Sequence, residues 1–476
     1  MISYPNLNKA DTLASLPGPW PQELFPGIRE AVNTGKDKIV ILDDDPTGTQ
    51  TVHGLPVLTT WDVRDLEKEL KNPGPGFFIL TNSRCMPAED ADKLAAQIGR
   101  NLKTASSATG VSPVVISRSD STLRGHFPNE VDAMAKALDQ KDLPYLIIPF
   151  FLEGGRLTID DIHYVAEKDE LVPAGQTPYA RDAAFGFESS DLKEWVEEKT
   201  CGRVPAKNVV SVSLRQIREG GPDKVAQTLS LVPLNGACII NAVSYEDMEV
   251  LVAALLKLKK SVPGFLFRTA ASFVRVYTGT QPRTELLSAK DLSSGSDRGG
   301  LFVVGSYVPK TTAQLDVLVK ESGVAPVELN VDLLLDSTNK QRAVQQAIDV
   351  TNKGLSQGKD MLVYTSRQLV TGTDAASSLD IGNIVSQSLV NIVKGLSHTP
   401  MYLVAKGGIT SSDIATQGLG VKRAMVQGQI LPGVPVWKLE SEARFPGMSY
   451  IIFPGNVGDD DALAVVQKKL AKVAPC

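Results

Sequence analysis

Short apolar runs alternate along the chain with longer stretches in which apolar residues recur at helical spacing. This alternation is typical of an α/β protein with mostly parallel sheets, because a helix must return the chain between parallel strands. The clearest helical stretches are residues 88–106, 129–140, 247–259 and 381–396. The apolar runs predict strands at residues 38–43, 77–82, 114–117, 143–150, 237–241, 264–268, 301–305, 361–365, 401–405 and 449–453.

Proline and glycine indicate where the chain divides. Residues 1–36 are rich in proline and lack periodicity, so we expect an arm on the first domain. The segment LSSGSDRGG, residues 292–300, is polar and glycine-rich, which predicts a linker. We therefore expect one α/β domain over residues 37–291, a second over residues 300–476, and an active-site cleft between them.

Charge and composition exclude several classes of protein. The 476 residues include 49 Lys and Arg against 54 Asp and Glu, a net charge of −5, so we expect no nucleic-acid partner. No apolar run approaches the ~20 residues that span a bilayer, and the N-terminus lacks the features of a secretory signal. Four scattered cysteines argue against a zinc site or a disulfide framework. We expect a cytoplasmic protein without a membrane partner.

Three consecutive carboxylates follow the first predicted strand, in the sequence DDDPTGT at residues 43–49. Because Asp and Gly are common turn formers, a solvated turn is one interpretation. The other is a functional one, since carboxylates at the carboxyl end of a strand can act as a base or hold Mg²⁺ or hydroxyl groups.

Further polar clusters follow other predicted strands: TNSR at 81–84, SRSDSTLRGH at 117–126 and EGGRLT at 153–158. Arginine offers a planar fork for a carboxylate, while Asp and Ser bind hydroxyls, so together they suit a small anionic, hydroxylated ligand. An exposed network of ion pairs before a helix is the alternative interpretation. Carboxyl ends of parallel strands share one edge of a sheet, so four such clusters indicate one site.

The second half of the chain carries glycine and hydroxyl residues after its strands, in GS at 305–306, KGGITSS at 406–412 and PGNVG at 454–458. Such segments expose backbone N–H groups, which can bind phosphates, although each alone is most simply a turn. Neither GxxxxGK[ST] nor GxGxxG is present. Any nucleotide site must therefore be of another type.

Taken in order, these motifs resemble those of the four-carbon acid sugar kinase family. The matches are DDPTG at 44–48, Ser83-Arg84, DSTLRG at 120–125 and GRLT at 155–158; the second half adds Gly305-Ser306, GGIT at 407–410 and GNVG at 455–458. The resemblance implies an acid-sugar-binding N-terminal domain and an ATP-binding C-terminal domain. It also implies transfer of the γ-phosphoryl group of ATP to a hydroxyl, typically O4, of threonate, erythronate or 3-oxo-tetronate.

The same resemblance suggests roles for individual residues. Candidate bases are Asp45 and Asp44. Mg²⁺ would bridge the phosphates of ATP, with ligands that the sequence does not identify. Candidate substrate-binding residues are Arg84, Asp120, Ser121, Arg124 and Arg156, and candidate ATP-binding residues are Ser306, Gly407, Gly408, Ile409, Thr410 and Gly455.

The sequence departs from the family pattern at several of these motifs. Arg118-Ser119 stands where Lys-Ile is usual, and His126 replaces Asn after DSTLRG. Ile409 occupies a position that is often acidic. The departures in the first half concern the identity of the acid, while those in the second half concern single contacts to ATP.

Two other classes of protein remain open on the sequence alone. A haloacid-dehalogenase-type phosphatase would use Asp43 as nucleophile and Asp45 as acid/base, with Thr81 as its second motif and Asp459-Asp460 as metal ligands. That reading leaves DSTLRG and GGIT without roles. A non-enzymatic regulator that binds a sugar acid is the second alternative, and it would need no ATP site. A homodimer is the default expectation for the oligomeric state.

Overall fold

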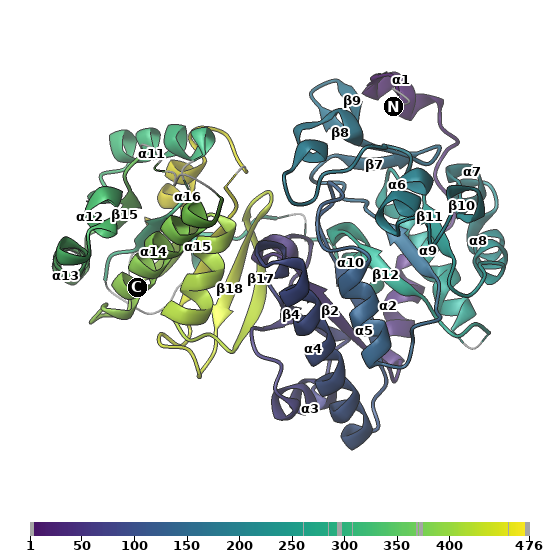
Figure 1. Cartoon of the computed structure of the whole chain (residues 1–476), viewed down its shortest axis with the longest axis horizontal. Coiled ribbons are helices and arrows are strands. Elements are labelled where there is room, and N and C mark those ends of the chain that lie inside the picture. The colour runs from purple at the N-terminus through teal and green to yellow at the C-terminus, as the bar shows by residue number, and fades with distance from the viewer. Residues whose placement is uncertain are drawn as a thin grey trace. The chain divides into compact units, whose positions relative to one another are not determined.

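The computed structural model describes residues 4–471, except 260, 284, 293–297, 307, 368–369, 371–374 and 456. The chain forms two compact units (Figure 1). The first comprises Met1–Leu55 and Thr60–Pro282, and the second comprises Pro56–Thr59 and Arg283–Cys476. Most of the predicted linker, residues 292–300, lies outside the described residues.

The first unit is built on a parallel sheet whose strands are short and apolar. Its strand order is β10-β11-β6-β12-β5-β2-β4, and each neighbouring pair is parallel. Parallel sheets are normally covered on both faces, which explains why these strands read as continuous apolar runs. The strands are β2 (Lys38–Asp43), β4 (Gly76–Leu80), β5 (Pro113–Arg118), β6 (Tyr145–Ile148), β10 (Val210–Val212), β11 (Ala237–Ile240) and β12 (Leu266–Thr269).

Successive side chains of β12 show how the two faces are covered. Leu266 packs into a core with Val131 of α5 and Trp195 of α6, whereas Phe267 stacks on Phe273 and also contacts Tyr277, both in α10. Neighbouring residues of a strand point to opposite faces, so α5 and α10 lie on opposite sides of the sheet. The helices of this unit include α3 (Val63–Lys71), α4 (Ala88–Thr109), α5 (Asn129–Ala137), α6 (Leu192–Lys199), α7 (Leu214–Arg218), α8 (Gly221–Ser230), α9 (Tyr245–Leu258) and α10 (Ala271–Tyr277).

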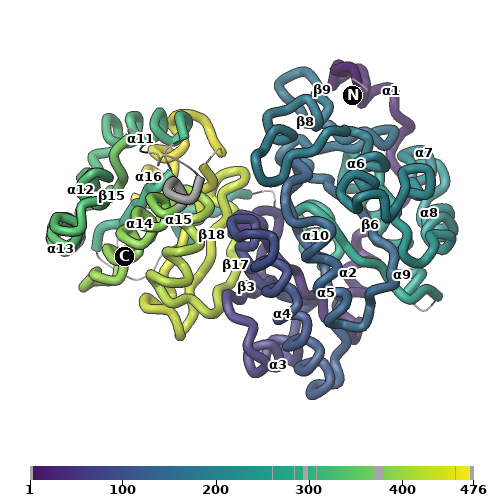
Figure 2. The backbone as a smooth tube through the Cα atoms, in the orientation of Figure 1, coloured from purple at the N-terminus to yellow at the C-terminus, as the bar shows by residue number. Residues whose placement is uncertain are grey.

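A small antiparallel sheet extends this unit after β6. Its order is β1-β9-β8-β7, and β1, near the N-terminus, pairs with β9 (Figure 2). Residues 4–36 also form helices α1 (Lys9–Ser15) and α2 (Phe25–Thr34), which the sequence did not predict, and Ile28 of α2 is buried. The strands of this sheet are β1 (Leu7–Asn8), β7 (Arg156–Ile159), β8 (Ile162–Glu167) and β9 (Glu170–Pro173).

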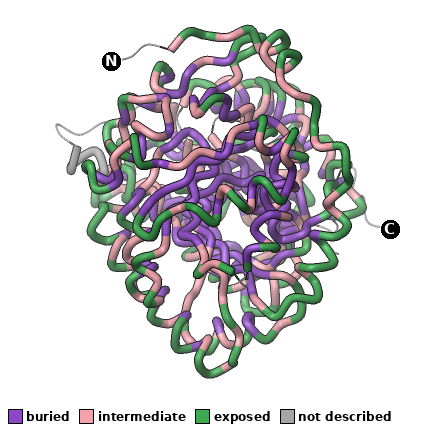
Figure 3. The backbone as a smooth tube through the Cα atoms, turned by 90° about the vertical axis from the view of Figure 1, so that its right-hand side faces the viewer, coloured by how far each residue is buried: buried purple, intermediate pink, exposed green. Residues whose placement is uncertain are grey.

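The second unit has a mixed sheet of order β3-β17-β18-β19-β16-β13-β15-β14. The five strands from β19 to β14 are parallel, while β3, β17 and β18 are antiparallel to their neighbours. Buried residues follow the strands in both units, and exposed residues follow the outer helices and loops (Figure 3). The strands are β3 (Pro56–Leu58), β13 (Leu301–Val304), β14 (Ala325–Leu329), β15 (Met361–Thr365), β16 (Tyr402–Lys406), β17 (Arg423–Leu431), β18 (Val434–Leu439) and β19 (Ser449–Phe453).

Helices cover this second sheet as in the first unit. Leu315 and Leu318 of α11 share a core with Phe302 and Val304 of β13 and with Leu463 of α16. The predicted α/β class, with two domains and mostly parallel sheets, is confirmed. The helices are α11 (Pro309–Glu321), α12 (Val331–Leu335), α13 (Ser337–Ser356), α14 (Ala375–Lys394), α15 (Gly408–Asp413) and α16 (Ala462–Ala471). The active-site cleft expected between the domains stays a prediction.

Candidate active site

The acidic turn after β2 places three carboxylates in different surroundings. Asp43 and Asp44 are buried, at 1% and 4% exposure, whereas the side chain of Asp45 is 21% exposed. Asp45 caps a 3₁₀ helix (Pro46–Thr51), and its Oδ1 accepts a hydrogen bond of 2.8 Å from the N–H of Thr47. Asp45 is therefore the member of the three that a ligand can reach most easily.

Arg84 ties this turn to the end of the neighbouring strand β4. Its guanidinium binds both carboxylate oxygens of Asp44, with Nε 3.1 Å from Oδ2 and Nη2 in contact with Oδ1. Nη1 also lies 3.5 Å from Oδ2 of Asp45. The structure thus brings together Asp44, Asp45 and Arg84, as expected for residues that follow adjacent parallel strands.

The DSTLRG segment folds into a compact loop after β5. Nε of Arg124 donates to Oδ2 of Asp120 at 2.7 Å, and the hydroxyl of Thr122 donates to the same oxygen. Leu123 and Gly125 have φ angles of 71° and 118°, so the loop relies on left-handed conformations that glycine accepts readily. The backbone carbonyl of Ser121 is held from behind by the buried ring of His163, at 2.7 Å from Nε2.

Arg156 reaches the same region from β7. The guanidiniums of Arg124 and Arg156 both lie over the ring of Tyr179, at 5.1 and 5.9 Å from its centroid. Both guanidiniums also make polar contacts, since Nη1 of Arg124 lies 3.5 Å from Oδ2 of Asp182 and Nη1 of Arg156 donates to the carbonyl of Gly154. All the candidate substrate residues except Ser121 therefore contribute charged side chains to this region, and Ser121 contributes its backbone to the loop.

Buried charges determine the protonation of these carboxyl groups. Burial alone would raise the pKa of Asp45, but the charge of Arg84 and the hydrogen bonds from Thr47 bring it below its ordinary value. Burial likewise opposes ionisation of Asp120, and Arg84 and Arg124 together hold its pKa well below the usual range. For Asp43 burial prevails and raises the pKa to about 7, although Arg118 acts in the opposite direction. Asp45 and Asp120 are therefore anionic at neutral pH.

Several residues of this region were not among the sequence-predicted site residues. Arg118, which belongs to the SRSDSTLRGH cluster but was assigned no role of its own, donates from Nη1 to Oδ1 of Asp43 at 2.8 Å. Arg268 of β12 is completely buried, lies over the ring of Trp195 and donates to the carbonyl of Arg124 at 3.1 Å. No local sequence pattern marks a strand arginine as buried, so only the fold reveals its position.

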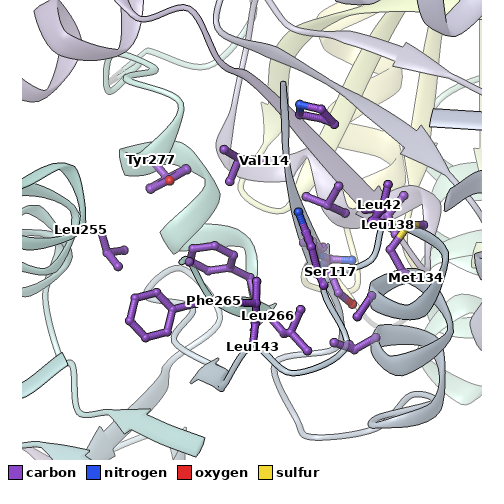
Figure 4. A pocket seen from close by; sticks show the side chains of 18 of the residues that line it. Leu42, Val114, Ser117, Met134, Leu138, Leu143, Leu255, Phe265, Leu266 and Tyr277 are labelled. Carbon is purple, nitrogen blue, oxygen red and sulfur yellow. The ribbon is translucent and has the colours of Figure 1, made fainter. Parts of the chain in front are cut away.

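A cavity of about 230 Å³ lies in the first unit beside this cluster (Figure 4). Asp44, Thr81 and Glu130 line part of it, but most of its wall is apolar. Such a lining suits an apolar group better than a hydroxylated anion. The apolar lining residues labelled in Figure 4 include Val114, Met134, Leu138, Leu143, Leu255, Phe265 and Leu266.

In the second unit, the glycine segments meet at the carboxyl ends of adjacent strands. A Cβ atom on Gly407 would lie 3.2 Å from Cβ of Ser306 and 3.4 Å from Oγ1 of Thr410, and one on Gly455 would lie 3.4 Å from Oγ of Ser306. Gly407, with φ of 112°, precedes α15, which begins at Gly408. The candidate ATP-binding residues therefore form one cluster, in which Ile409 is 56% exposed. The predicted GNVG segment includes residue 456, which lies outside the described residues.

Lys406 contacts the backbone of this cluster of candidate ATP-binding residues, which we call the glycine cradle. No role was assigned to Lys406 from the sequence. Its side chain is completely buried, and Nζ donates to the carbonyls of Pro454 and Gly455 at 2.8 and 3.3 Å. Burial lowers its pKa to about 7, and the charge of Lys310 acts in the same direction. Lys406 thus connects the end of β16 with the end of β19.

Within the described residues, no group of three or more His, Cys, Asp or Glu is placed to hold a metal ion. No helix of that part of the chain is both long and apolar enough to cross a bilayer.

Two family models match the chain: a sugar-binding N-terminal domain over residues 39–277 and a nucleotide-binding C-terminal domain over residues 301–463. The chain belongs to the four-carbon acid sugar kinase family. The resemblance inferred from the motifs is therefore confirmed.

Two curated members of this family are similar over most of the chain. D-erythronate kinase of Heliobacterium modesticaldum is 23% identical over 453 residues, covering 89% of this chain and 95% of that protein. D-threonate kinase of Salmonella typhimurium is 24% identical over 401 residues, covering 81% and 86% respectively.

Solved structures show the same fold at lower identity. Haemophilus influenzae protein HI1011 matches with a TM-score of 0.62 at 17% identity, over 90% of this chain and all of its own. A structure from Salmonella typhimurium LT2 matches with a TM-score of 0.65 at 17% identity, over 90% of this chain and 99% of its own.

Proposed function

We propose that this protein is an ATP-dependent kinase that phosphorylates a four-carbon sugar acid such as erythronate, threonate or 3-oxo-tetronate. The proposed acceptor is the hydroxyl O4. The proposal rests on the presence of two kinds of site in one chain, one suited to the acid and one suited to the nucleotide. The first unit gathers carboxylates and guanidiniums suited to a hydroxylated anion, and the second gathers a glycine and hydroxyl cradle suited to phosphates. The names of the curated relatives support the same reaction class.

In the proposed mechanism, the arginines of the first unit bind the carboxylate of the sugar acid. Arg124 and Arg156 are oriented by Tyr179, and Arg84 is fixed by Asp44. Asp120 has a pKa far below neutrality and is therefore an acceptor for substrate hydroxyls. Holding both ends of a small acid in this way restricts which hydroxyl can attack, and positioning accounts for much of the catalysis of phosphoryl transfer.

Asp45 is the proposed base. Asp44 has both carboxylate oxygens bound to Arg84, whereas Asp45 is more exposed and makes only a 3.5 Å contact to that arginine. Its lowered pKa keeps it ionised, so it can accept the proton of the attacking hydroxyl as the bond to phosphorus forms. The weak basicity is consistent with a loose transition state, in which the proton is transferred late.

The nucleotide would bind at Ser306, Gly407, Gly408, Thr410 and Gly455, with its phosphates against the start of α15 and the hydroxyls of Ser306 and Thr410. The N–H of Gly407 donates to the carbonyl of Phe453, so Gly407 would contribute close backbone approach rather than a donor. Mg²⁺ would neutralise charge on the phosphates of ATP, and because it commonly keeps several waters it needs few ligands from the protein. Ile409, exposed beside the cradle, offers an apolar contact rather than a charge. The cytoplasmic location and the homodimer stay predictions.

The phosphatase alternative is disfavoured by the surroundings of Asp43. A nucleophile must be accessible, but Asp43 is 1% exposed and is bound by Arg118. Gly48 covers it as well, because a Cβ atom there would overlap both oxygens of the Asp43 carboxylate. A non-enzymatic regulator would need no nucleotide site, so this alternative does not explain the glycine cradle of the second unit.

A coupled assay of ADP release tests the proposed function. Purified protein, ATP and Mg²⁺ are mixed with D-erythronate, L-erythronate, D-threonate, L-threonate or 3-oxo-tetronate. We expect at least one acid to raise ADP release well above the acid-free rate. ADP release that no acid increases would contradict the proposal, and binding of an acid without turnover would favour the regulator.

A further inference from the structure

We propose that Arg367 is a phosphate-binding residue of the nucleotide site, donating from the free edge of its guanidinium to the polyphosphate of ATP. The inference rests on the proposed function, because it assumes that the cradle of the second unit binds a nucleotide. Neither the sequence motifs nor the family resemblance assigns a role to this residue.

Three hydrogen bonds hold the guanidinium of Arg367 against the cradle. Arg367 lies just beyond the carboxyl end of β15 (Met361–Thr365). Its Nη2 donates to the carbonyl of Ser306 at 2.7 Å and to Oγ1 of Thr312 at 3.1 Å, and Nε lies 3.3 Å from the same hydroxyl. The planar group is therefore fixed in orientation, which is the arrangement that arginine uses for anions.

The third nitrogen of this guanidinium has no partner among the described residues. Nη1 of Arg367 is buried, and the described residues supply no hydrogen-bond acceptor for it. Burial lowers the pKa of Arg367, and the charges of Asp316 and Glu328 only partly offset this effect. A buried donor without an acceptor is unfavourable, so a ligand that supplies an acceptor at this position would be favoured.

The strand order places this donor next to the glycine segments. β13, which precedes Ser306, lies between β16, which precedes Gly407, and β15, which precedes Arg367. Neighbouring strands are about 4.8 Å apart. Because Nη2 of Arg367 donates to the carbonyl of Ser306, its guanidinium lies at the end of β13, the strand next to β16 and its glycine segment.

Two other cations favour an anion at the same edge. Lys406 is buried beneath Gly455, and Lys310, in the first turn of α11, donates to the carbonyl of Gly458 at 3.1 Å. Lys406 uses two of its three N–H donors on backbone carbonyls and Lys310 uses one, so each lysine retains donor capacity. A ligand with several negative charges would therefore be favoured over a neutral nucleoside, and Arg367 would add a planar donor of fixed orientation.

Binding of ADP and adenosine to the full-length protein tests this inference. The variants are Arg367→Met, which removes the charge, and Arg367→Lys, which keeps the charge but loses the planar fork. Arg342→Met is the matched control, since Arg342 is an exposed residue of α13 in the same unit. Dissociation constants are measured by titration calorimetry, with adenosine measured by competition and folding checked by circular dichroism.

We expect Arg367→Met to weaken ADP binding by about tenfold or more and Arg367→Lys by less, the usual scale for a charge-assisted hydrogen bond. Adenosine binding and the Arg342→Met control should stay within about twofold of wild type. Unchanged ADP affinity in Arg367→Met, or an equal loss for adenosine and ADP, would overturn the inference and leave the proposed function standing. If the wild-type protein binds no ADP, this inference and the proposed function are both contradicted. If Arg367→Met does not fold, Arg367→Lys decides by the same comparison.

Discussion

Nη1 of Arg118 lies 2.8 Å from Oδ1 of Asp43, and both side chains are almost completely buried. The pair joins the ends of β5 and β2, which are neighbours in the sheet. Arg118 thus holds the buried carboxylate of Asp43, whereas the carboxylates of Asp44 and Asp45 contact Arg84. The roles of the three aspartates can therefore be separated by mutation.

Asp45→Asn should lower kcat by ~10²-fold or more, because the amide cannot accept the proton of the attacking hydroxyl. Asp43→Asn should mainly reduce the free energy of unfolding, by about 1–3 kcal/mol, because it removes the carboxylate that accepts from Arg118 and leaves that arginine with the 3.6 Å contact to Asp44. Steady-state kinetics and urea denaturation of both variants check this difference. A phosphomonoesterase activity that Asp43→Asn abolishes and ATP does not affect would contradict it.

Arg124→Lys should raise the KM for the sugar acid more than the KM for ATP. Lysine keeps the charge but loses both the planar fork and the stacking on Tyr179. Initial rates are measured with each substrate varied in turn. An equal increase in both KM values would instead indicate that Arg124 serves the folding of the loop.

Gly48→Ala should lower the free energy of unfolding by about 1–3 kcal/mol, since the added methyl group would overlap the carboxylate of Asp43. Gly27→Ala is the matched control: Gly27 is a helical residue of α2 with nothing within 4 Å of a Cβ atom. There we expect no loss, and a gain of up to about 1 kcal/mol. Urea denaturation of the two variants gives the comparison, and equal stability would show that Gly48 does not cover Asp43.

The stability of the protein should depend on His163 between pH 4 and 6.5. Burial lowers the pKa of His163 from 6.5 to about 4. The unfolded chain then binds more protons than the folded one in this range, so the contribution is complete above pH 6.5 and is lost as the pH falls toward 4. It amounts to about 3 kcal/mol. The loss of stability between pH 7 and pH 4 should therefore be smaller in His163→Gln than in wild type by that amount, and equal losses would contradict the assignment.

The strands that carry the site could be predicted from the sequence because they are buried on both faces. Residues 38–43 and 361–365 were predicted with the same bounds as β2 (Lys38–Asp43) and β15 (Met361–Thr365). The strands β7 to β9 were missed because polar residues interrupt their apolar pattern; Thr158 of β7 and His163 of β8 are polar and yet completely buried. Helix α13 (Ser337–Ser356) was missed because few of its residues are buried.

Part of the site could also be predicted, because the carboxyl ends of parallel strands share one edge of a sheet. Asp44 and Arg84 follow adjacent parallel strands, so their motifs had to meet at one edge. Tyr179 and Arg268 could not be assigned, because one comes from a 3₁₀ turn (Pro178–Arg181) and the other from within a strand. Their roles depend on which charged groups the fold places nearby.

The most direct test of the account is the ³¹P NMR spectrum of the reaction product, recorded with the acid that best stimulates ADP release. We predict one new phosphomonoester signal for each ADP formed, split into a triplet by the two protons of a carbon-4 methylene group. Asp45→Asn should form this product at least ~10²-fold more slowly. A doublet would place the phosphate on another hydroxyl. Inorganic phosphate in place of a phosphomonoester would contradict the assignment of this protein as a sugar-acid kinase.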